Sequence, residues 1–386
     1  MSIRVTTLDE KIHEIPTNES PMASQEYFVN MGPQHPSTHG VLRLVLKMDG
    51  ETVREILPVL GYIHRGIEKK GEHIGYRQFV HLTDRLDYLS ALANNWAVSM
   101  VVEKAMNIEL NDRIQTIRTI MAELQRIQSH QLWWGVFGMD LGAFTPFLYG
   151  FRDREKITTI LEETIGARLT MNYIQPGGLM FDIQPDFAKK VKEFISYFKP
   201  KLEEYETLVS NNVIFEQRMK NVGILDAATA VSIGTTGPVL RASGVAHDLR
   251  KDEPYGVYGK VQFKVAVGSV GDSWDRYRVR IEEMRQSIQI VEQLIDNIPE
   301  GKTLVMKPAI KIKLPAGNYY SHIETARGIF GVFVVADGTD RPYRIHLRTP
   351  NFNNLWAVTV TAPGWRLADL VTILSSLDIV VPDIDR

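Results

Sequence analysis

Hydrophobic and polar residues alternate through much of residues 26–60, which is the pattern of half-buried β-strands. The run at 41–46 and the run that follows it are separated by Asp49-Gly50, a dipeptide that favours a tight hairpin turn. We therefore expect the N-terminal part of the fold to be rich in β-structure.

From residue 66 onward the hydrophobic spacing becomes helical, and it predicts a mainly helical bundle over residues 66–300. Asn111 is a suitable N-cap, because its side chain can accept a hydrogen bond from a free amide of the first turn. Thr145-Pro146 predicts an N-cap followed by proline at the first helical position, and Gly166 predicts the end of that helix. The predicted helices are 88–107, a long helix after Asn111, 145–165, 185–211 and 273–297.

Residues 303–386 are expected to be β-rich, with strands at 303–315, 320–336 and 343–360. The pattern as a whole predicts an α+β fold, in which sheet segments fold back over a central helical bundle. We expect one domain over residues 26–386, preceded by a flexible polar segment over residues 1–25.

Composition excludes several classes of function. The chain has 386 residues and a formal net charge of −2, so no overall attraction to nucleic acid or acidic lipid is expected. No apolar run approaches the roughly 18 residues that cross a bilayer, and the acidic first fifteen residues do not resemble a secretory signal. If the protein works at a membrane, we expect partner subunits to hold it there.

The chain contains no cysteine, so it can form no disulfide and offers no thiolate to zinc, nickel or an iron–sulfur cluster. Five histidines at positions 35, 39, 64, 73 and 81 invite a metal interpretation. Their spacing matches no compact zinc pattern, and we predict no metal site.

The segment 31–40 contains two histidines four residues apart, His35 and His39, in a stretch that cannot be helical. Pro33 and Pro36 fix their backbone φ angles and remove amide donors, and Gly40 permits a turn. Two interpretations follow from the spacing: a simple turn with a solvated or core histidine, or a loop that presents a proton-exchanging imidazole.

The segment 31–40 is similar to a signature of the quinone-site subunits of respiratory complex I, the D subunits of NADH-quinone oxidoreductase, within the [NiFe]-hydrogenase large-subunit family. Further blocks resemble this family in the same order. They are residues 61–69, 84–88, 139–147, 240–245, 341–344 and 376–386. Agreement of so many blocks over residues 27–386 is far more specific than one short motif.

The resemblance implies a hydrogenase-like cavity that has lost its metal. Hydrogenase large subunits hold their metals with two cysteine pairs, and these positions correspond here to Asp87 with Ser90 and to Val380 with Asp383. None of the four can supply a thiolate, so the resemblance implies that the cavity admits a quinone head group, of menaquinone or ubiquinone, in place of a metal.

Quinone reduction takes two electrons and two protons, and the protons come from groups within hydrogen-bond reach of the quinone oxygens. The resemblance places His39 and Tyr88 in these roles and Asp140 as the counter-charge of His39. We expect His39 and Asp140 to form a charge-assisted pair. Each residue also has an ordinary interpretation: Tyr88 as a core residue, Asp140 as a helix terminator, and His130 as a hydrogen-bonded core histidine.

Six further positions are predicted to bind the quinone or to lie beside it or its electron donor: His35, Arg65, Arg85, Asp87, Val380 and Asp383. In the family, Arg65 and Arg85 would lie near the iron–sulfur cluster of the adjacent subunit, where positive charge raises its potential. Asp87 and Asp383 could belong to a proton path or to a structural network.

The implied function is the quinone-binding subunit of a proton-pumping NADH:quinone oxidoreductase, on the cytoplasmic face of a bacterial inner membrane. The implied partners are the cluster-bearing B subunit, the C subunit and the H subunit of the membrane arm. The chain has no Gly-x-Gly-x-x-Gly motif between a strand and a helix, so we expect no NADH site of its own. Alternatives are a metal-dependent hydrogenase, which the missing cysteines disfavour, and a non-catalytic scaffold subunit of a related membrane-bound complex.

Three departures from the family pattern stand out. Thr170 replaces a histidine that ties the potential of the neighbouring cluster to pH, and Gln175 replaces an arginine. Losing both positive charges should lower that potential, which would suit a low-potential quinone such as menaquinone. The chain is also short between Met306 and Tyr319, where we expect only a peripheral effect.

Overall fold

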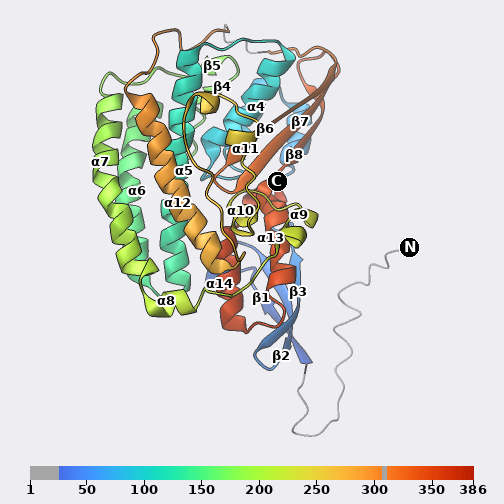
Figure 1. The fold of residues 1–386 in the computed structure, drawn as a ribbon. Helices are drawn as coiled ribbons and strands as arrows, with labels where there is room; N and C mark the ends of the chain where they lie inside the picture. Colours follow the sequence, from blue (N-terminus) through green and yellow to red (C-terminus); the bar gives the residue numbers. More distant parts are fainter. Residues whose placement is uncertain (1–25, 307–310) are drawn as a thin grey trace.

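The computed structural model describes residues 26–306 and 311–386, so the predicted flexible segment 1–25 lies outside the described residues. Long helices combine with small antiparallel sheets, as the predicted α+β class requires. Figure 1 shows the long helices side by side as a bundle, with one sheet beside its upper end and another to its lower right.

The N-terminal sheet confirms the predicted hairpin. Its three antiparallel strands are β1 (Glu26–Met31), β2 (Arg43–Asp49) and β3 (Thr52–Val59), in the order β1-β2-β3. Asp49 pairs with Thr52 across the turn. Alternate β2 side chains, including Leu44 and Leu46, are buried in a core shared with the C-terminal helices, which explains the alternation in the sequence.

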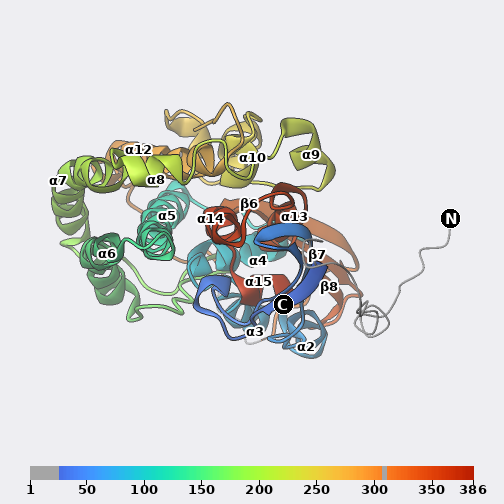
Figure 2. The same cartoon turned by 90° about the horizontal axis from the view of Figure 1, so that it is seen from below.

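The long helices form the central bundle. They are α4 (Ala91–Ala105), α5 (Asp112–Asp140), α6 (Phe144–Ile165), α7 (Phe187–Tyr205) and α12 (Ser273–Ile295). α5 packs against α6 and α12, while α7 packs against both of these neighbours; Figure 2 shows the four helices nearly end on. As predicted, the side chain of Asn111 caps α5, accepting a hydrogen bond from the amide of Ile114 at 3.0 Å.

The predicted start of α6 is wrong by two residues. Ala143 is the N-cap, and Pro146 lies inside the first turn, where a proline costs no helical hydrogen bond. The predicted end is confirmed, because Gly166 adopts the left-handed conformation with φ of +83°. α7 begins two residues after Pro185, and a π-helical turn η2 (Glu206–Ser210) continues it to Asn211.

Short elements connect the bundle to the sheets. They are η1 (Pro36–Thr38), α2 (Ile67–His73), α3 (Tyr76–Thr83), β4 (Ile174–Gln175), β5 (Gly178–Leu179), α8 (Val213–Gln217), α9 (Ala227–Ser232), α10 (Pro238–Ala242), α11 (Leu249–Asp252) and η3 (Tyr258–Lys260).

The C-terminal part is only half as β-rich as predicted. Its sheet is β6 (Gly317–Thr325), β7 (Gly328–Ala336) and β8 (Pro342–Arg348), so the region 320–336 is a hairpin. Three helices follow, namely α13 (Pro350–Thr361), α14 (Leu367–Leu377) and α15 (Val381–Asp385).

Two predicted strands in this region are wrong in whole or in part, and the predicted strand 343–360 matches β8 (Pro342–Arg348) only in its first part. Residues 350–360 are helical, because Pro350 begins α13 and one apolar face, including Leu355 and Val358, is buried. Burial of that face overrides the strand preference of its β-branched residues. In the described part of 303–315, only Leu304 forms a bridge, with Gly178, and residues 307–310 lie outside the described residues.

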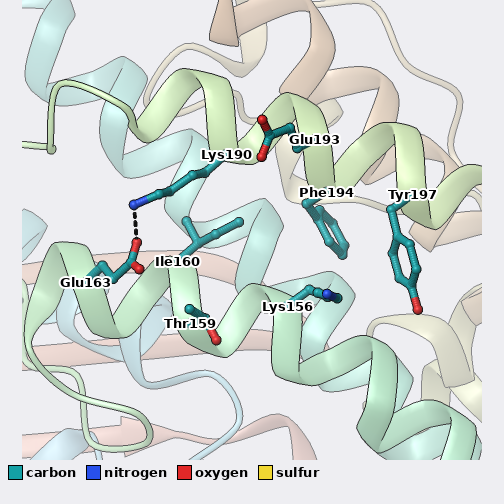
Figure 3. Close-up of a pocket in the computed structure, with 8 residues that line it drawn as sticks. All are labelled: Lys156, Thr159, Ile160, Glu163, Lys190, Glu193, Phe194 and Tyr197. Atoms are coloured by element: carbon teal, nitrogen blue, oxygen red, sulfur yellow. Dashed lines mark hydrogen bonds and ion pairs between the residues drawn. The ribbon is translucent and has the colours of Figure 1, made fainter.

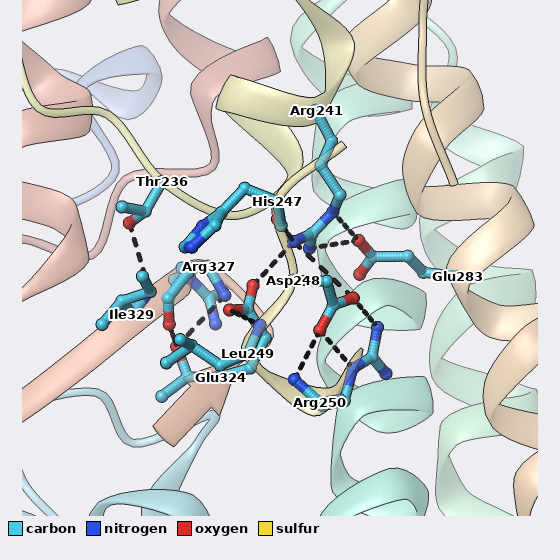
Figure 4. A network of polar contacts seen from close by, with 12 residues as sticks. Thr236, Arg241, His247, Asp248, Leu249, Arg250, Glu283, Glu324, Arg327 and Ile329 are labelled. Carbon is cyan, nitrogen blue, oxygen red and sulfur yellow. Dashed lines mark hydrogen bonds and ion pairs between the residues drawn. The ribbon is translucent and has the colours of Figure 1, made fainter. Parts of the chain in front are cut away.

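A buried ion network fixes the β6–β7 hairpin against the bundle (Figure 4). Arg241 of α10 contacts Glu283 of α12 at 2.6 Å and Glu324 of β6 at 2.8 Å. Asp248 pairs with Arg250 at 2.7 Å beside it. Burial alone would raise the pKa of Glu283, but Arg241 and a hydrogen bond from His130 lower it well below its ordinary value.

Across residues 26–306 and 311–386, no helix combines the length and the apolar character that crossing a membrane requires.

Candidate functional site

His39 and Asp140 lie in contact although 101 residues separate them in the sequence. His39 Nε2 is 2.6 Å from Asp140 Oδ2, and the two side chains are 16% and 6% exposed. The predicted contact is therefore present. At this distance and with this burial, a protonated imidazole and an ionised carboxylate form a strong charge-assisted hydrogen bond.

The two side chains come from separate elements. The segment 31–40, predicted not to be helical, contains a three-residue 3₁₀ turn, η1, and His39 ends this turn in the left-handed conformation with φ of +52°. Asp140 is the last residue of α5. From α14, Ser375 Oγ donates a second hydrogen bond to Asp140 Oδ2 at 2.5 Å.

His35 has a different position. Its Nδ1 accepts a hydrogen bond from the amide of Ser37 at 3.2 Å, so it caps η1 and is exposed. The structure does not place it in contact with the His39–Asp140 pair, and its predicted role toward the quinone stays a prediction.

Tyr88 lies before α4 and is 37% exposed, so it is not the plain core residue of the ordinary interpretation. Burial raises its pKa, Arg327 opposes that effect, and Asp87 and Asp378 add to it. Burial raises the pKa of Asp378, and Asp87 adds to this effect. Arg327, Arg280 and His39 oppose it but do not cancel it. Tyr88 and His39 thus each interact electrostatically with Asp378.

Arg327 links the carboxylates of this region. It is 1% exposed, and its guanidinium contacts Asp87 at 3.1 Å and Asp378 at 3.0 Å. Ser129 of α5 accepts a further hydrogen bond at 2.8 Å. Asp87 is thus the partner of a cation.

Asp383 and Val380 are also buried. Asn351 of α13 donates to Asp383 Oδ2 at 2.7 Å and accepts from the amide of Val380 at 3.2 Å, while Asp383 Oδ1 has no hydrogen-bond partner. Burial, with a contribution from Asp87, raises the pKa of Asp383 to about 7. This carboxyl group can therefore exchange a proton near neutral pH.

Arg65 and Arg85 lie beside each other, because Arg65 Nη2 donates to the carbonyl of Arg85 at 2.6 Å. Arg85 is exposed and Arg65 is partly buried. Burial and the charge of Arg85 lower the pKa of Arg65. The charges of Arg65 and Arg85 therefore interact, and Asp385 acts on Arg65 as an opposing charge.

Three other histidines have partners of their own. His130 is the predicted hydrogen-bonded core histidine: its Nε2 is 2.9 Å from Glu283, and burial lowers its pKa to about 4. His64 contacts the carbonyl of Asp385 at 2.6 Å, and His81 contacts Asn172. Within residues 26–306 and 311–386, no three His, Asp or Glu side chains are grouped so as to hold a metal ion.

A pocket between α6 and α7 lies apart from these residues (Figure 3). Its walls include Lys156 and Glu193, and Lys190 pairs there with Glu163 at 2.5 Å. A quinone head group needs an apolar enclosure with a few polar contacts. The charged walls of this pocket do not offer that.

Sequence reasoning missed three residues of the site, Ser375, Arg327 and Asp378. Asp378 lies inside the C-terminal block 376–386, so its position in a family motif was a usable signal. Ser375 is one of two adjacent serines in an apolar stretch, and nothing local sets it apart from Ser376. Nothing around Arg327 in the sequence distinguishes it from a surface arginine.

Comparison with known proteins gives consistent matches. The family model described as "Respiratory-chain NADH dehydrogenase, 49 Kd subunit" matches residues 140–313 and 308–386. The C/D subunit of NADH-quinone oxidoreductase from Bacteroides thetaiotaomicron is 52% identical over 363 residues, which is 94% of this chain and 68% of that protein. The D subunits of the same enzyme from Desulforamulus reducens and Bacillus anthracis are each 47% identical, over 94% of this chain and 99% of theirs.

Proposed function

The chain belongs to the family of the 49 kDa subunit of respiratory-chain NADH dehydrogenase, and we propose that it forms the quinone-reducing wall of that complex. Its relatives are subunits of NADH-quinone oxidoreductase, so the other subunits of that complex are its partners. The observation that supports a quinone site in this chain is the buried contact between His39 and Asp140.

His39 is the proposed proton donor to one quinone oxygen. An imidazole holds and releases a proton near neutral pH, and the adjacent carboxylate of Asp140, 2.6 Å away, stabilises its charged form. Tyr88 is the proposed donor to the other oxygen, with a partly exposed ring that can pack against an apolar head group.

The overall step is balanced. A quinone takes up two electrons and two protons, and its two carbonyl oxygens become the hydroxyl groups of the quinol. The two protons come from His39 and Tyr88, which are then reprotonated. Loss of the imidazole proton leaves Asp140 without its counter-charge, and we propose that its reprotonation or release begins the coupling to proton translocation.

The electrons come from an iron–sulfur cluster in a neighbouring subunit, which we propose to be the B subunit. Arg65 and Arg85 would face that cluster, and their positive charge would raise its potential. We propose the C subunit and the H subunit of the membrane arm as further neighbours, at the cytoplasmic face of the inner membrane.

We also propose that the cavity descends from a hydrogenase metal site. Asp87 and Asp383 occupy two of the positions equivalent to metal-binding cysteines, and both are buried and facing polar partners. With carboxylates in place of thiolates, the proposed cavity is polar at one end. It then offers no soft ligand for nickel.

The test is the His39→Ala variant in the assembled complex. Loss of a general acid should lower NADH:quinone reductase activity by about 10²–10⁴-fold, while reduction of artificial acceptors upstream of the quinone is unchanged. His346→Ala is the matched control, because its side chain is exposed on β8. Normal quinone reduction by an assembled His39→Ala complex would reject the proposal.

A further inference from the structure

We propose that Ser375 is a positioning residue whose hydrogen bond to Asp140 makes the His39–Asp140 pair release its proton more readily. The inference rests on the proposed function, because it concerns the readiness of His39 to protonate quinone. Ser375 would act through Asp140, with no contact to the substrate required.

The geometry puts two donors on one carboxylate oxygen. Asp140 Oδ2 lies 2.6 Å from His39 Nε2 and 2.5 Å from Ser375 Oγ. Ser375 is fully buried, so water does not compete for its hydroxyl group. Both donors therefore draw on the same negative charge.

Ser375 is held in place by the helix that ends in Asp140. Its carbonyl accepts a hydrogen bond from Trp133 Nε1 of α5 at 2.9 Å. Trp133 and Asp140 are seven residues apart, about two helical turns, so both lie on the face of α5 toward α14. One residue of α14 is thus bonded to α5 through its carbonyl and through its hydroxyl.

The chemical consequence follows from charge. A hydrogen bond from a neutral hydroxyl stabilises the carboxylate and reduces the negative charge available to the imidazolium. The imidazolium is then less stabilised and releases its proton to a quinone oxygen more easily. Without the hydroxyl, the pair should hold the proton more tightly.

Other charged groups interact with the pair or with its neighbours. Asp378, at the end of α14, interacts with His39 and is itself balanced by Arg327 and Arg280. Asp87 pairs with Arg327, and Arg276 of α12 bonds to the neighbouring Ser376. Removing the Ser375 hydroxyl leaves all of these charges in place.

The experiment measures quinone reductase activity against pH in the assembled complex carrying Ser375→Ala. A general acid must be protonated, so activity falls on the alkaline side as the pair loses its proton. We expect this limb to move to higher pH by about one unit, with a severalfold lower rate on the plateau. An alkaline limb unchanged by Ser375→Ala would overturn the proposal.

Matched variants separate this effect from damage to the fold. Ser376→Ala removes the adjacent hydroxyl, which bonds to Ile373 and Arg276, and should leave the limb unmoved. Ser375→Thr keeps the donor and should restore the wild-type limb; if its methyl group prevents assembly, Ser375→Cys, a weaker donor, should give an intermediate shift. In an Asp140→Asn background, Ser375→Ala should cause no further shift, and an equal shift there would overturn the proposal.

The two proposals fail in different ways. If His39→Ala retains normal activity, the proposed function is wrong. If His39→Ala loses activity but Ser375→Ala keeps the wild-type pH profile, only the role of Ser375 is wrong.

Discussion

Arg327 and Asp378 face each other in the core, with Arg327 Nη2 3.0 Å from Asp378 Oδ1 and Arg327 Nε donating to the Asp378 carbonyl at 3.2 Å. Arg327 lies in the turn between β6 and β7, whereas Asp378 follows α14 with a left-handed φ of +59°. This contact joins the β6–β7 hairpin to the end of α14, the helix that carries Ser375. It also supplies the cation that two buried carboxylates require.

We predict that Arg327→Met destabilises the protein by about 3–5 kcal/mol, because it leaves Asp87 and Asp378 buried without their shared cation. The measurement is thermal unfolding of this subunit in the complex. Adding Asp87→Asn and Asp378→Asn should recover part of the loss, since the uncompensated charges are then absent.

Arg344→Met is the matched control for this prediction. Arg344 pairs with Glu68 and Glu72, but it is 45% exposed, so its loss should cost no more than about 1 kcal/mol. An equal cost for the two arginine variants would show that the buried charges are not the cause.

We predict a pH-dependent stability that originates in Asp383. Burial raises its pKa from an ordinary value of 3.8 to about 7, so between these values the folded state binds more protons than the unfolded state. The free energy of unfolding therefore falls by up to about 4 kcal/mol as pH rises from about 4 to 7. Above pH 7 it levels off.

Asp383→Asn should remove this term. The variant keeps an oxygen that can accept the hydrogen bond from Asn351. It should therefore be more stable than the wild type at pH 8, and this difference in stability should shrink as the pH falls toward 5. Melting temperatures of the complex across this range test the prediction. A gain that is constant with pH would contradict it.

We predict that Thr170→His makes the potential of the iron–sulfur cluster that we propose for the adjacent subunit depend on pH. Thr170 is exposed in the loop after α6, where a histidine could take up a proton on the surface. A redox titration should give a slope approaching about 59 mV per pH unit near neutrality in the variant and a flat, lower potential in the wild type. A strongly pH-dependent potential in the wild type would contradict this interpretation.

The sequence alone determined the elements that depend on local chemistry. The Asp49-Gly50 hairpin, the Asn111 cap and the stop at Gly166 follow from turn geometry and free backbone groups, which short segments fix without their neighbours. The family blocks also pointed to His39, Tyr88 and Asp140 before any contact was known.

Only the tertiary structure decided which of these residues meet. α13 is a helix because burial of one face outweighs the strand preference of its residues. Asp140 contacts His39 and Ser375, which are 101 and 235 residues away in the sequence. Arg327 contacts Asp87 and Asp378, which are 240 and 51 residues away. A buried charge can be stabilised by any opposite charge or donor that packing brings to it, so its partner cannot be found from spacing in the chain.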